Sequence, residues 1–191
     1  MKLSQIVWIL VVLALAFGCQ KKQEAEQEVA VATTEQQEAV SITDVSAFSY
    51  VCFPYTGSYE NHETVIGALM EAASTQGFEL TGPMLGVYYN SPADTPADSL
   101  LWEIGFKVPD SMEVTDPLVV KKWVFTKVAK AMHTGSYETV DQTYPKIFEF
   151  IAKQNLMPAG PTMERFLSDP QQVAPEELKT EIWVPVKGGQ M

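Results

Sequence analysis

Residues suited to metal binding and nucleophilic catalysis are scarce in this chain of 191 residues, which has two cysteines and two histidines. It has no His/Cys cluster with the spacing of a metal site, no Ser-His-Asp order and no Gly-rich phosphate loop. No apolar run approaches the roughly 20 residues that a membrane-spanning helix needs. These absences argue against metal-dependent, serine-dependent and phosphate-binding enzymes.

Positive charge is scarce as well. The chain has 13 Lys and Arg against 24 Asp and Glu, a net charge of −11. From residue 47 onward, ten basic residues stand against eighteen acidic ones, a net charge of −8. A nucleic-acid surface needs clustered Lys and Arg to neutralise phosphates. The composition therefore predicts no nucleic-acid partner.

The first 18 residues have the organisation of a secretion signal. Lys2 supplies a positive start, residues 6–17 form an apolar run, and Gly18-Cys19 closes it. A Cys directly after a small residue resembles a bacterial lipobox, although Phe17 stands where that pattern prefers a small residue. The resemblance implies that Cys19 is lipidated and anchors an exported domain to a membrane of the cell envelope, on the periplasmic side or the outer surface. The alternative is ordinary cleavage after Ala16, which would release a soluble product.

Residues 19–46 are expected to be the lipidated Cys followed by a disordered tether. This stretch is rich in Gln, Glu, Ala, Val and Thr and has no aromatic residue, so it buries little apolar surface. The remaining residues, 47–191, suit one domain. Within it Cys52 lies in an apolar strand without a nearby base, so we expect a buried thiol rather than a nucleophile.

The globular part is a duplicated unit. The pentapeptide Thr-Gly-Ser-Tyr-Glu of residues 56–60 recurs at residues 134–138, 78 positions later. Gly82-Pro83 recurs as Gly160-Pro161 at the same offset, and about fifty-five residues align without a gap. This register assigns repeat one to residues 47–109 and repeat two to residues 121–187.

Each repeat reads as strand, helix, strand, strand. Apolar residues at helical spacing give each helix one stripe, and the closing strands alternate with period two. The pattern predicts an α+β fold in which two helices cover one side of antiparallel sheets. The expected helix stripes are Ile66, Leu69, Met70 and Ala73, and Tyr144, Ile147, Phe148 and Ile151. The strand faces toward the helices are Leu100, Trp102, Ile104, Phe106 and Val108, and Leu178, Thr180, Ile182, Val184 and Val186.

The opposite faces of the closing strands carry a carboxylate at the same internal position. Repeat one has Glu103 and Lys107 there, and repeat two has Glu181, Trp183 and Lys187. Considered alone, this pattern is typical of a half-exposed antiparallel sheet with its polar residues outward.

The order of motifs in repeat two resembles the GyrI-like small-molecule-binding domain, a family that includes the effector-binding modules of AraC-type and MerR-type multidrug-responsive regulators. The resemblance covers residues 47–187, and its strongest element is the closing strand. The motifs are His-Thr-Gly-Ser-Tyr at residues 133–137, Gly160-Pro161, Asp169-Pro170, and Thr-Glu-Ile-Trp-Val-Pro-Val at residues 180–186.

The resemblance implies two βαββ units related by pseudo-twofold symmetry, with the helices on one side and a ligand cleft on the other. It also implies a glutamate on the final strand that receives cationic lipophilic ligands among aromatic rings. This residue matches Glu181, and Glu103 is its counterpart in repeat one. Ring faces and a buried carboxylate suit an organic cation. The expected rings are Trp183, on the strand face of Glu181, and Tyr137 and Tyr59 at the two strand-to-helix turns, where each equally fits a core residue whose hydroxyl caps a turn.

These features favour an envelope-anchored binding protein for hydrophobic or cationic amphipathic small molecules, without a cofactor. The transcriptional and gyrase-inhibiting roles of the family are not expected here, because a signal and a tether stand where a DNA-binding segment would lie.

Three alternatives remain open, of which one is a purely structural envelope protein. Some GyrI-like domains resemble hydrolases of electrophilic small molecules, in which Glu181 and Tyr137 would act as acid and base. The SOUL haem-binding family also resembles this duplicated fold, and only His62 and His133 are available as haem ligands. Binding is favoured over catalysis because the sequence has none of the common catalytic constellations.

Overall fold

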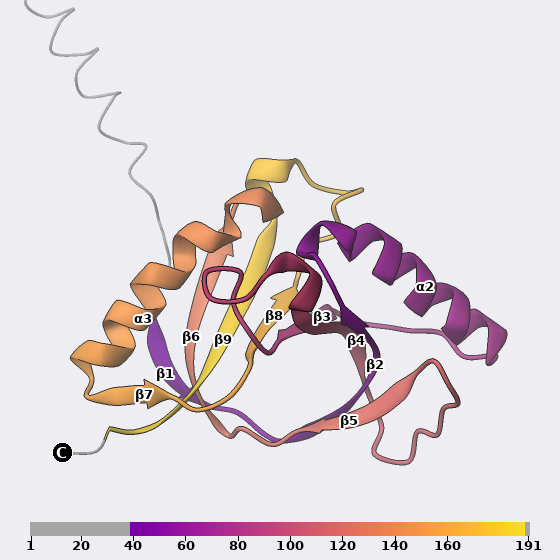
Figure 1. Ribbon diagram of the computed structural model, residues 1–191, viewed down its shortest axis with the longest axis horizontal. Helices are drawn as coiled ribbons and strands as arrows, with labels where there is room; N and C mark the ends of the chain where they lie inside the picture. The colour runs from indigo at the N-terminus through magenta and orange to yellow at the C-terminus, as the bar shows by residue number, and fades with distance from the viewer. Residues whose placement is uncertain (1–38, 190–191) are drawn as a thin grey trace, which may run out of the picture. The chain divides into compact units, whose positions relative to one another are not determined.

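A computed structural model describes residues 39–189, so the signal sequence, Cys19 and most of the expected tether lie outside the described residues. Two α-helices lie against one face of a nine-stranded antiparallel sheet (Figure 1). Within this part of the chain no helix is both long and apolar enough to cross a membrane. The helices are α2 (His62–Thr75) and α3 (Tyr144–Lys153), and the strands are β1 (Ser41–Asp44), β2 (Phe48–Thr56), β3 (Met84–Tyr88), β4 (Leu101–Val108), β5 (Val119–Trp123), β6 (Lys127–Thr134), β7 (Leu156–Pro158), β8 (Thr162–Phe166) and β9 (Lys179–Gly188).

The two halves of the sheet have the same topology. The strand order is β1-β6-β9-β8-β3-β4-β2-β5, with β7 paired to β9. Strands β3 and β8 meet at the centre, where Gly86 lies opposite Glu164, the residue 78 positions later. A pseudo-twofold axis therefore passes between these two residues. The predicted α+β fold of duplicated βαββ units, with both helices on one side, is confirmed.

The duplication also includes a strand before each repeat. Strand β1 begins at Ser41 and β5 begins at Val119, again 78 residues apart. These strands are exchanged, since β1 pairs with β6 of repeat two and β5 pairs with β2 of repeat one. The registers correspond, because Ser41 lies opposite Lys130 and Val119 lies opposite Cys52, the residue equivalent to Lys130.

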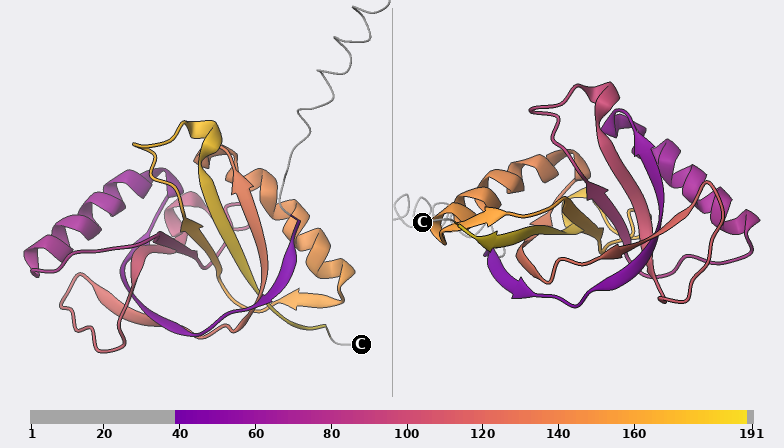
Figure 2. Two further views of the ribbon diagram at one scale, coloured as in Figure 1. Left: turned by 180° about the vertical axis from the view of Figure 1, so that it is seen from behind. Right: turned by 60° about the horizontal axis from the view of Figure 1, so that its bottom comes forward.

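This exchange moves a boundary expected from the sequence. Residues 41–44, which the composition assigned to the tether, form β1 and bond to the backbone of β6. A sheet edge offers unpaired backbone groups, so even a short polar strand gains hydrogen bonds there. The connections after β1 and β5 meet where the Val45 amide donates to the Thr126 carbonyl at 2.8 Å, and Figure 2 shows their course from behind and from below.

Apolar cores lie beneath both helices on the helix-covered face of the sheet. The helix stripes differ in part from the prediction, because Met70 and Phe148, which are equivalent positions, are 46% and 43% exposed. In α2, Val65 and Ala72 are buried instead, since helical periodicity does not decide which of two adjacent apolar residues faces the sheet. Eight of the ten predicted strand residues are in these cores, namely Leu100, Trp102, Ile104, Phe106 and Val108 under α2, and Ile182, Val184 and Val186 under α3. The other two, Leu178 and Thr180, are buried as well.

The opposite face of the sheet, called here the helix-free face, has an apolar core of its own. Its ring pair is Trp123 and Trp183, with centroids 6.3 Å apart. Cys52 is fully buried in this core, and burial raises the pKa of its thiol. Gly105 stands where repeat two has Trp183, because a Cβ at Gly105 would lie 2.1 Å from the Val51 carbonyl oxygen. The remaining members of the core include Tyr50, Leu85, Val87, Val128 and Met163.

Candidate functional site

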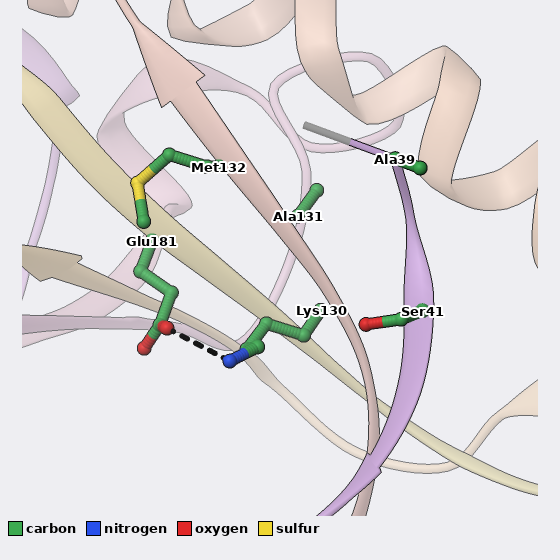
Figure 3. A pocket seen from close by; sticks show the side chains of 6 residues that line it. All are labelled: Ala39, Ser41, Lys130, Ala131, Met132 and Glu181. Carbon is green, nitrogen blue, oxygen red and sulfur yellow. Dashed lines mark ion pairs between the residues drawn. The ribbon is translucent and has the colours of Figure 1, made fainter. Parts of the chain in front are cut away.

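Glu181 lies on the helix-free face of β9, where other side chains of the chain bind its carboxylate. The residue is 7% exposed. Lys130 Nζ lies 3.2 Å from Oε1, while the Arg165 guanidinium and the Trp183 indole N–H donate to Oε2. The Arg165 guanidinium also lies over the Trp183 ring, 4.9 Å from its centroid. Figure 3 shows Lys130 reaching the Glu181 carboxylate. The hollow that these two residues help to line has a volume of only about 50 Å³. The carboxylate and the ring predicted to receive a ligand cation thus hold cations of this chain.

Glu103, the equivalent of Glu181, is also bound from within the chain. It is 1% exposed and accepts hydrogen bonds from the Tyr50 hydroxyl at 2.6 Å and the Tyr89 hydroxyl at 2.9 Å. Its cation is Lys121 on edge strand β5, whose ammonium donates to Oε2 and lies 5.2 Å from the Tyr89 ring centroid. A hollow of about 320 Å³ opens beside this group.

Tyr59 and Tyr137 occupy equivalent places at the two strand-to-helix turns. The Tyr59 hydroxyl donates to the Asn90 carbonyl at 2.7 Å, and the Tyr137 hydroxyl donates to the Ser168 carbonyl at 3.5 Å. Both hydroxyls therefore hold a loop that follows the neighbouring strand, which is the turn-capping arrangement considered from the sequence. The Tyr137 ring contacts the Phe166 ring, which lies opposite Thr180 on the helix-covered face. Tyr137 is therefore across the sheet from Glu181, and the structure does not bring this pair together.

Both histidines use their ring nitrogens in hydrogen bonds. His62 Nδ1 bonds to the Tyr59 carbonyl, and its Nε2 lies 2.9 Å from the Tyr88 hydroxyl. His133 Nδ1 lies 2.9 Å from Thr143 Oγ1, and its Nε2 lies 3.2 Å from a backbone carbonyl. Within residues 39–189 no group of three or more His, Cys, Asp and Glu is placed to hold a metal ion. The haem alternative gains no support from these positions.

A third buried glutamate lies on the helix-covered face. Glu164 on β8 is 6% exposed and sits beside the pseudo-twofold axis. Its Oε1 accepts from the Tyr144 hydroxyl of α3 at 2.7 Å, and its Oε2 lies 3.3 Å from the Tyr88 hydroxyl of β3. No ion pair to Glu164 forms among residues 39–189. Both repeats contribute to this group, called here the central cluster: Tyr59, His62, Tyr88, Tyr144 and Glu164.

Aromatic rings extend the central cluster on the side of repeat one. The Tyr59 ring meets the Tyr88 ring edge-on, with centroids 5.1 Å apart. The His62 and Trp102 rings lie 4.3 Å apart. Burial raises the pKa of Tyr59 to about 12 and raises those of Tyr88 and Tyr144 well above 10, so all three hydroxyls remain hydrogen-bond donors at neutral pH. A carboxylate among ring faces and neutral hydroxyls is an arrangement that suits an organic cation.

The hydrogen bonds of the central cluster form one chain from Glu164 through Tyr88 to His62. Burial raises the pKa of Glu164 and lowers the pKa of His62, so the neutral forms of both groups are favoured. Because His62 Nδ1 faces a carbonyl, the neutral ring carries its proton there, and Nε2 accepts the Tyr88 proton. A protonated Glu164 then donates to the Tyr88 oxygen, whereas an ionised Glu164 needs the Tyr88 proton for itself. The charge on Glu164 is therefore coupled to the protonation of His62.

Glu164 was not among the site residues expected from the sequence, but the sequence contained a usable signal. In the strand of residues 162–166, period-two alternation places Glu164 on the same face as Thr162 and Phe166, toward the helices. A carboxylate on the face that helices cover is rare unless it is satisfied or functional. The equivalent residue in repeat one is Gly86, so the duplication did not draw attention to this position.

The family described as the GyrI-like small molecule binding domain matches residues 38–187. The chain belongs to this family. The matched residues include β1, which the structure also places in the sheet. The domain therefore begins before residue 47, the boundary expected from the sequence. A comparison with curated proteins gave no match.

Solved structures share the fold of this GyrI-like domain at low identity. The C-terminal domain of EcmrR has a TM-score of 0.70 at 12% identity, covering 81% of this chain and 99% of that one. An uncharacterised conserved protein from Listeria innocua has a TM-score of 0.63 at 15% identity, covering 86% and 98%. A hydrolase from Listeria innocua has a TM-score of 0.60 at 16% identity, covering 87% and 98%. At such identities these likenesses establish the fold alone.

Proposed function

We propose that this GyrI-like domain binds hydrophobic or cationic amphipathic small molecules and that Glu164 is the carboxylate that receives a ligand cation. The observation that carries the proposal is the contrast among three buried glutamates. Glu103 and Glu181 hold cations of the chain, whereas Glu164 is bound by tyrosine hydroxyls and has no ion pair among residues 39–189.

Charge compensation favours Glu164 physically. Burying a carboxylate without a counter-ion is costly, and the cost appears here as a raised pKa of Glu164. An organic cation brought to Glu164 removes that cost, and the rings of Tyr59, Tyr88 and Tyr144 replace its weak hydration with cation–π contacts. At Glu181 the same ligand would first have to displace Arg165 and Lys130.

Ligand entry requires the central cluster to open. Glu164 and Tyr88 are buried, while Tyr59 and Tyr144 are half-buried and so have access to solvent. Tyr59 lies in the turn before α2, and Tyr144 is the first residue of α3. The ligand therefore enters between these two rings, from the side of the helices.

Titration with a matched pair of ligands tests the site. Methyltriphenylphosphonium carries a charge and triphenylphosphine oxide does not, and neither has an N–H group. By isothermal titration calorimetry, Glu164→Gln should weaken binding of the phosphonium by about 1–3 kcal/mol and leave the neutral ligand nearly unchanged. Glu181→Gln is the matched control, because it removes a buried carboxylate of the same domain. If only Glu181→Gln weakens the phosphonium, Glu181 is the ligand carboxylate; if neither does, binding is purely apolar and the proposal fails.

Hydrolysis of electrophilic small molecules is a second candidate function, favoured by one observation. Burial raises the pKa of Glu164, and its carboxyl lies 2.7 Å from the Tyr144 hydroxyl, so a carboxylic acid and a phenol lie side by side in one hydrogen bond. As a general acid, Glu164 would protonate the heteroatom of a strained ring as its bond to carbon breaks, while water adds to that carbon and returns one proton to the Glu164 carboxylate. Turnover of styrene oxide to its diol by the wild type, and its loss in Glu164→Gln with binding retained, would establish this activity.

We further propose that the domain is held at a bacterial cell envelope by lipid on Cys19. The support is the sequence pattern of residues 1–19, with an apolar run that ends in Gly18-Cys19. A tether of roughly twenty residues before β1 would let the domain reach ligands at some distance from the membrane surface.

A further inference from the structure

The hollow beside Glu103 is separate from the central cluster, because it opens on the helix-free face of the sheet. Its volume of about 320 Å³ is at the lower end of the range for small-molecule sites. Two of its apolar walls, Tyr89 and Leu101, are 45% and 47% exposed. Its polar end is Glu103 with Lys121, and Pro54, Tyr55, Thr56 and Trp102 complete the lining.

The two polar groups at this end differ in how firmly they are held. Glu103 is fixed, since it is 1% exposed and accepts hydrogen bonds from Tyr50 and Tyr89 as well as from Lys121. Lys121 is the movable partner, because its side chain is 35% exposed and comes from the edge strand β5. A lysine ammonium on a flexible stem is well solvated when it turns outward. The cation can therefore leave while the carboxylate stays.

Comparison of the repeats indicates that Lys121 is not a fixed part of the fold. Glu181 takes its cations from Lys130 and Arg165, whose equivalents in repeat one are Cys52 and Val87. The equivalent of Lys121 in β1 is Thr43. The two carboxylates are thus neutralised by cations from non-equivalent positions of the repeats. The buried Glu103 carboxylate requires a cation beside it, but the fold does not require that this cation be Lys121.

We propose that Glu103 anchors a second binding site, for a primary or secondary ammonium that carries an aryl or alkyl group, and that Lys121 occupies this site as a tethered competitor. A ligand ammonium takes the place of the Lys121 ammonium at Oε2, and its apolar group lies against Tyr89 and Leu101. The exchange leaves the charge of the site unchanged, because one ammonium replaces another.

The chemistry of the vacated position selects the ligand class. Lys121 donates N–H groups to both the Glu103 carboxylate and the Tyr89 hydroxyl, the latter at 3.3 Å. A quaternary ammonium or a phosphonium has no N–H and leaves these acceptors without a donor. A primary or secondary ammonium supplies both the charge and the donors. The site is therefore distinct in its ligands from the one proposed at Glu164.

Substitution of the competitor provides the test, with 2-phenylethylamine as the probe and the full chain in mild detergent. A tethered ammonium competes at an effective concentration in the millimolar range or above, so its removal should tighten binding. By calorimetry at pH 8, where the probe is protonated, Lys121→Met should bind the amine at least ten-fold more tightly than the wild type. Lys121→Arg, which keeps a competing cation, should show no such gain. Equal affinity of the wild type and a folded Lys121→Met would overturn the proposal.

Two further measurements establish where the amine binds. Glu103→Gln combined with Lys121→Met must abolish the gain, and a gain that survives it would place the amine elsewhere and overturn the proposal. If Lys121→Met does not fold, NMR of ¹³C-labelled lysine in the wild type decides: the amine should shift the Lys121 Cε signal, and an unchanged signal at saturation overturns the proposal. The roughly ten-fold gain from Lys121→Met should persist in a Glu164→Gln background, because that gain depends on Glu103 alone, so the two proposed sites succeed or fail separately.

Discussion

Gly86 and Glu164 lie opposite each other at the centre of the sheet, and they are the same position of the two repeats. The two residues serve one site in different ways. A Cβ at Gly86 would lie 2.5 Å from the Tyr88 hydroxyl oxygen, so the glycine leaves the space in which Tyr88 turns toward Glu164. Glu164 supplies the carboxylate. The two repeats have therefore diverged at the pseudo-twofold axis. Repeat one has a glycine there, which leaves space for the Tyr88 ring, and repeat two has a carboxyl group.

This relationship predicts the effect of Gly86→Ala. The new methyl group meets the flexible end of Tyr88 and not backbone, so the fold should lose only about 1–2 kcal/mol of unfolding free energy. Binding of methyltriphenylphosphonium should weaken as well, because Tyr88 is displaced from the central cluster. The check is a double-mutant cycle by denaturant unfolding: in a Tyr88→Leu background the substitution should cost clearly less. Equal costs in both backgrounds would show that the contact with Tyr88 does not govern this position.

Glu164 should make the free domain less stable at neutral pH than in acid. Its pKa is raised in the fold, so between the unfolded value near 4.3 and the folded value the native state binds more protons, and stability falls as pH rises. Glu164→Gln should therefore raise the free energy of unfolding at pH 7. The gain should shrink toward zero below about pH 4, where the carboxyl is protonated in both states. Urea unfolding of both proteins across pH measures it, and a variant that is less stable at pH 7 contradicts the assignment.

Gly105 in β4 and Gly67 in α2 should change stability in opposite directions when each is replaced by alanine. At Gly105 the added Cβ would lie 2.1 Å from the Val51 carbonyl oxygen of the paired strand, so Gly105→Ala should cost about 3 kcal/mol or more. At Gly67 nothing lies within 4 Å, and the residue is in the exposed middle of α2, so Gly67→Ala should stabilise by about 0.5–1 kcal/mol. Thermal unfolding of the two variants checks both signs.

The lipid anchor is tested by Cys19→Ala. If Cys19 is lipidated, the variant should move from the membrane fraction to the soluble fraction, because a dozen apolar residues are too few to span a bilayer. Fractionation followed by immunoblotting measures the shift. A wild-type N-terminus at Phe17, mapped by mass spectrometry, would instead show ordinary cleavage after Ala16.

The sequence alone was sufficient for the duplication, the fold class and the strand faces beneath the helices. The duplication is visible because residues recur 78 positions later in the sequence. The faces of helices and strands follow the periodicity of apolar residues within a single element, so no knowledge of other elements is needed. The buried state of Cys52 was predicted on the same basis, because an apolar strand without a nearby base shows it locally. The same reasoning misplaced Met70 and Phe148, where adjacent apolar residues left the rotation of each helix open.

Only the tertiary structure decided which buried carboxylate lacks an ion pair among residues 39–189. Glu181, Glu103 and Glu164 are all buried, and they differ in partners contributed by other elements. Arg165 reaches Glu181 from β8 and Lys121 reaches Glu103 from β5, while Tyr88 meets Glu164 from 76 positions away in the sequence. Likewise, β1 belongs to the sheet because the outer edge of β6 has backbone groups with which it can pair. The sequence of residues 41–44 gives no indication of that edge. Charge compensation and edge pairing depend on which segments meet in space, and for that reason they were decided by the fold and not by any local pattern.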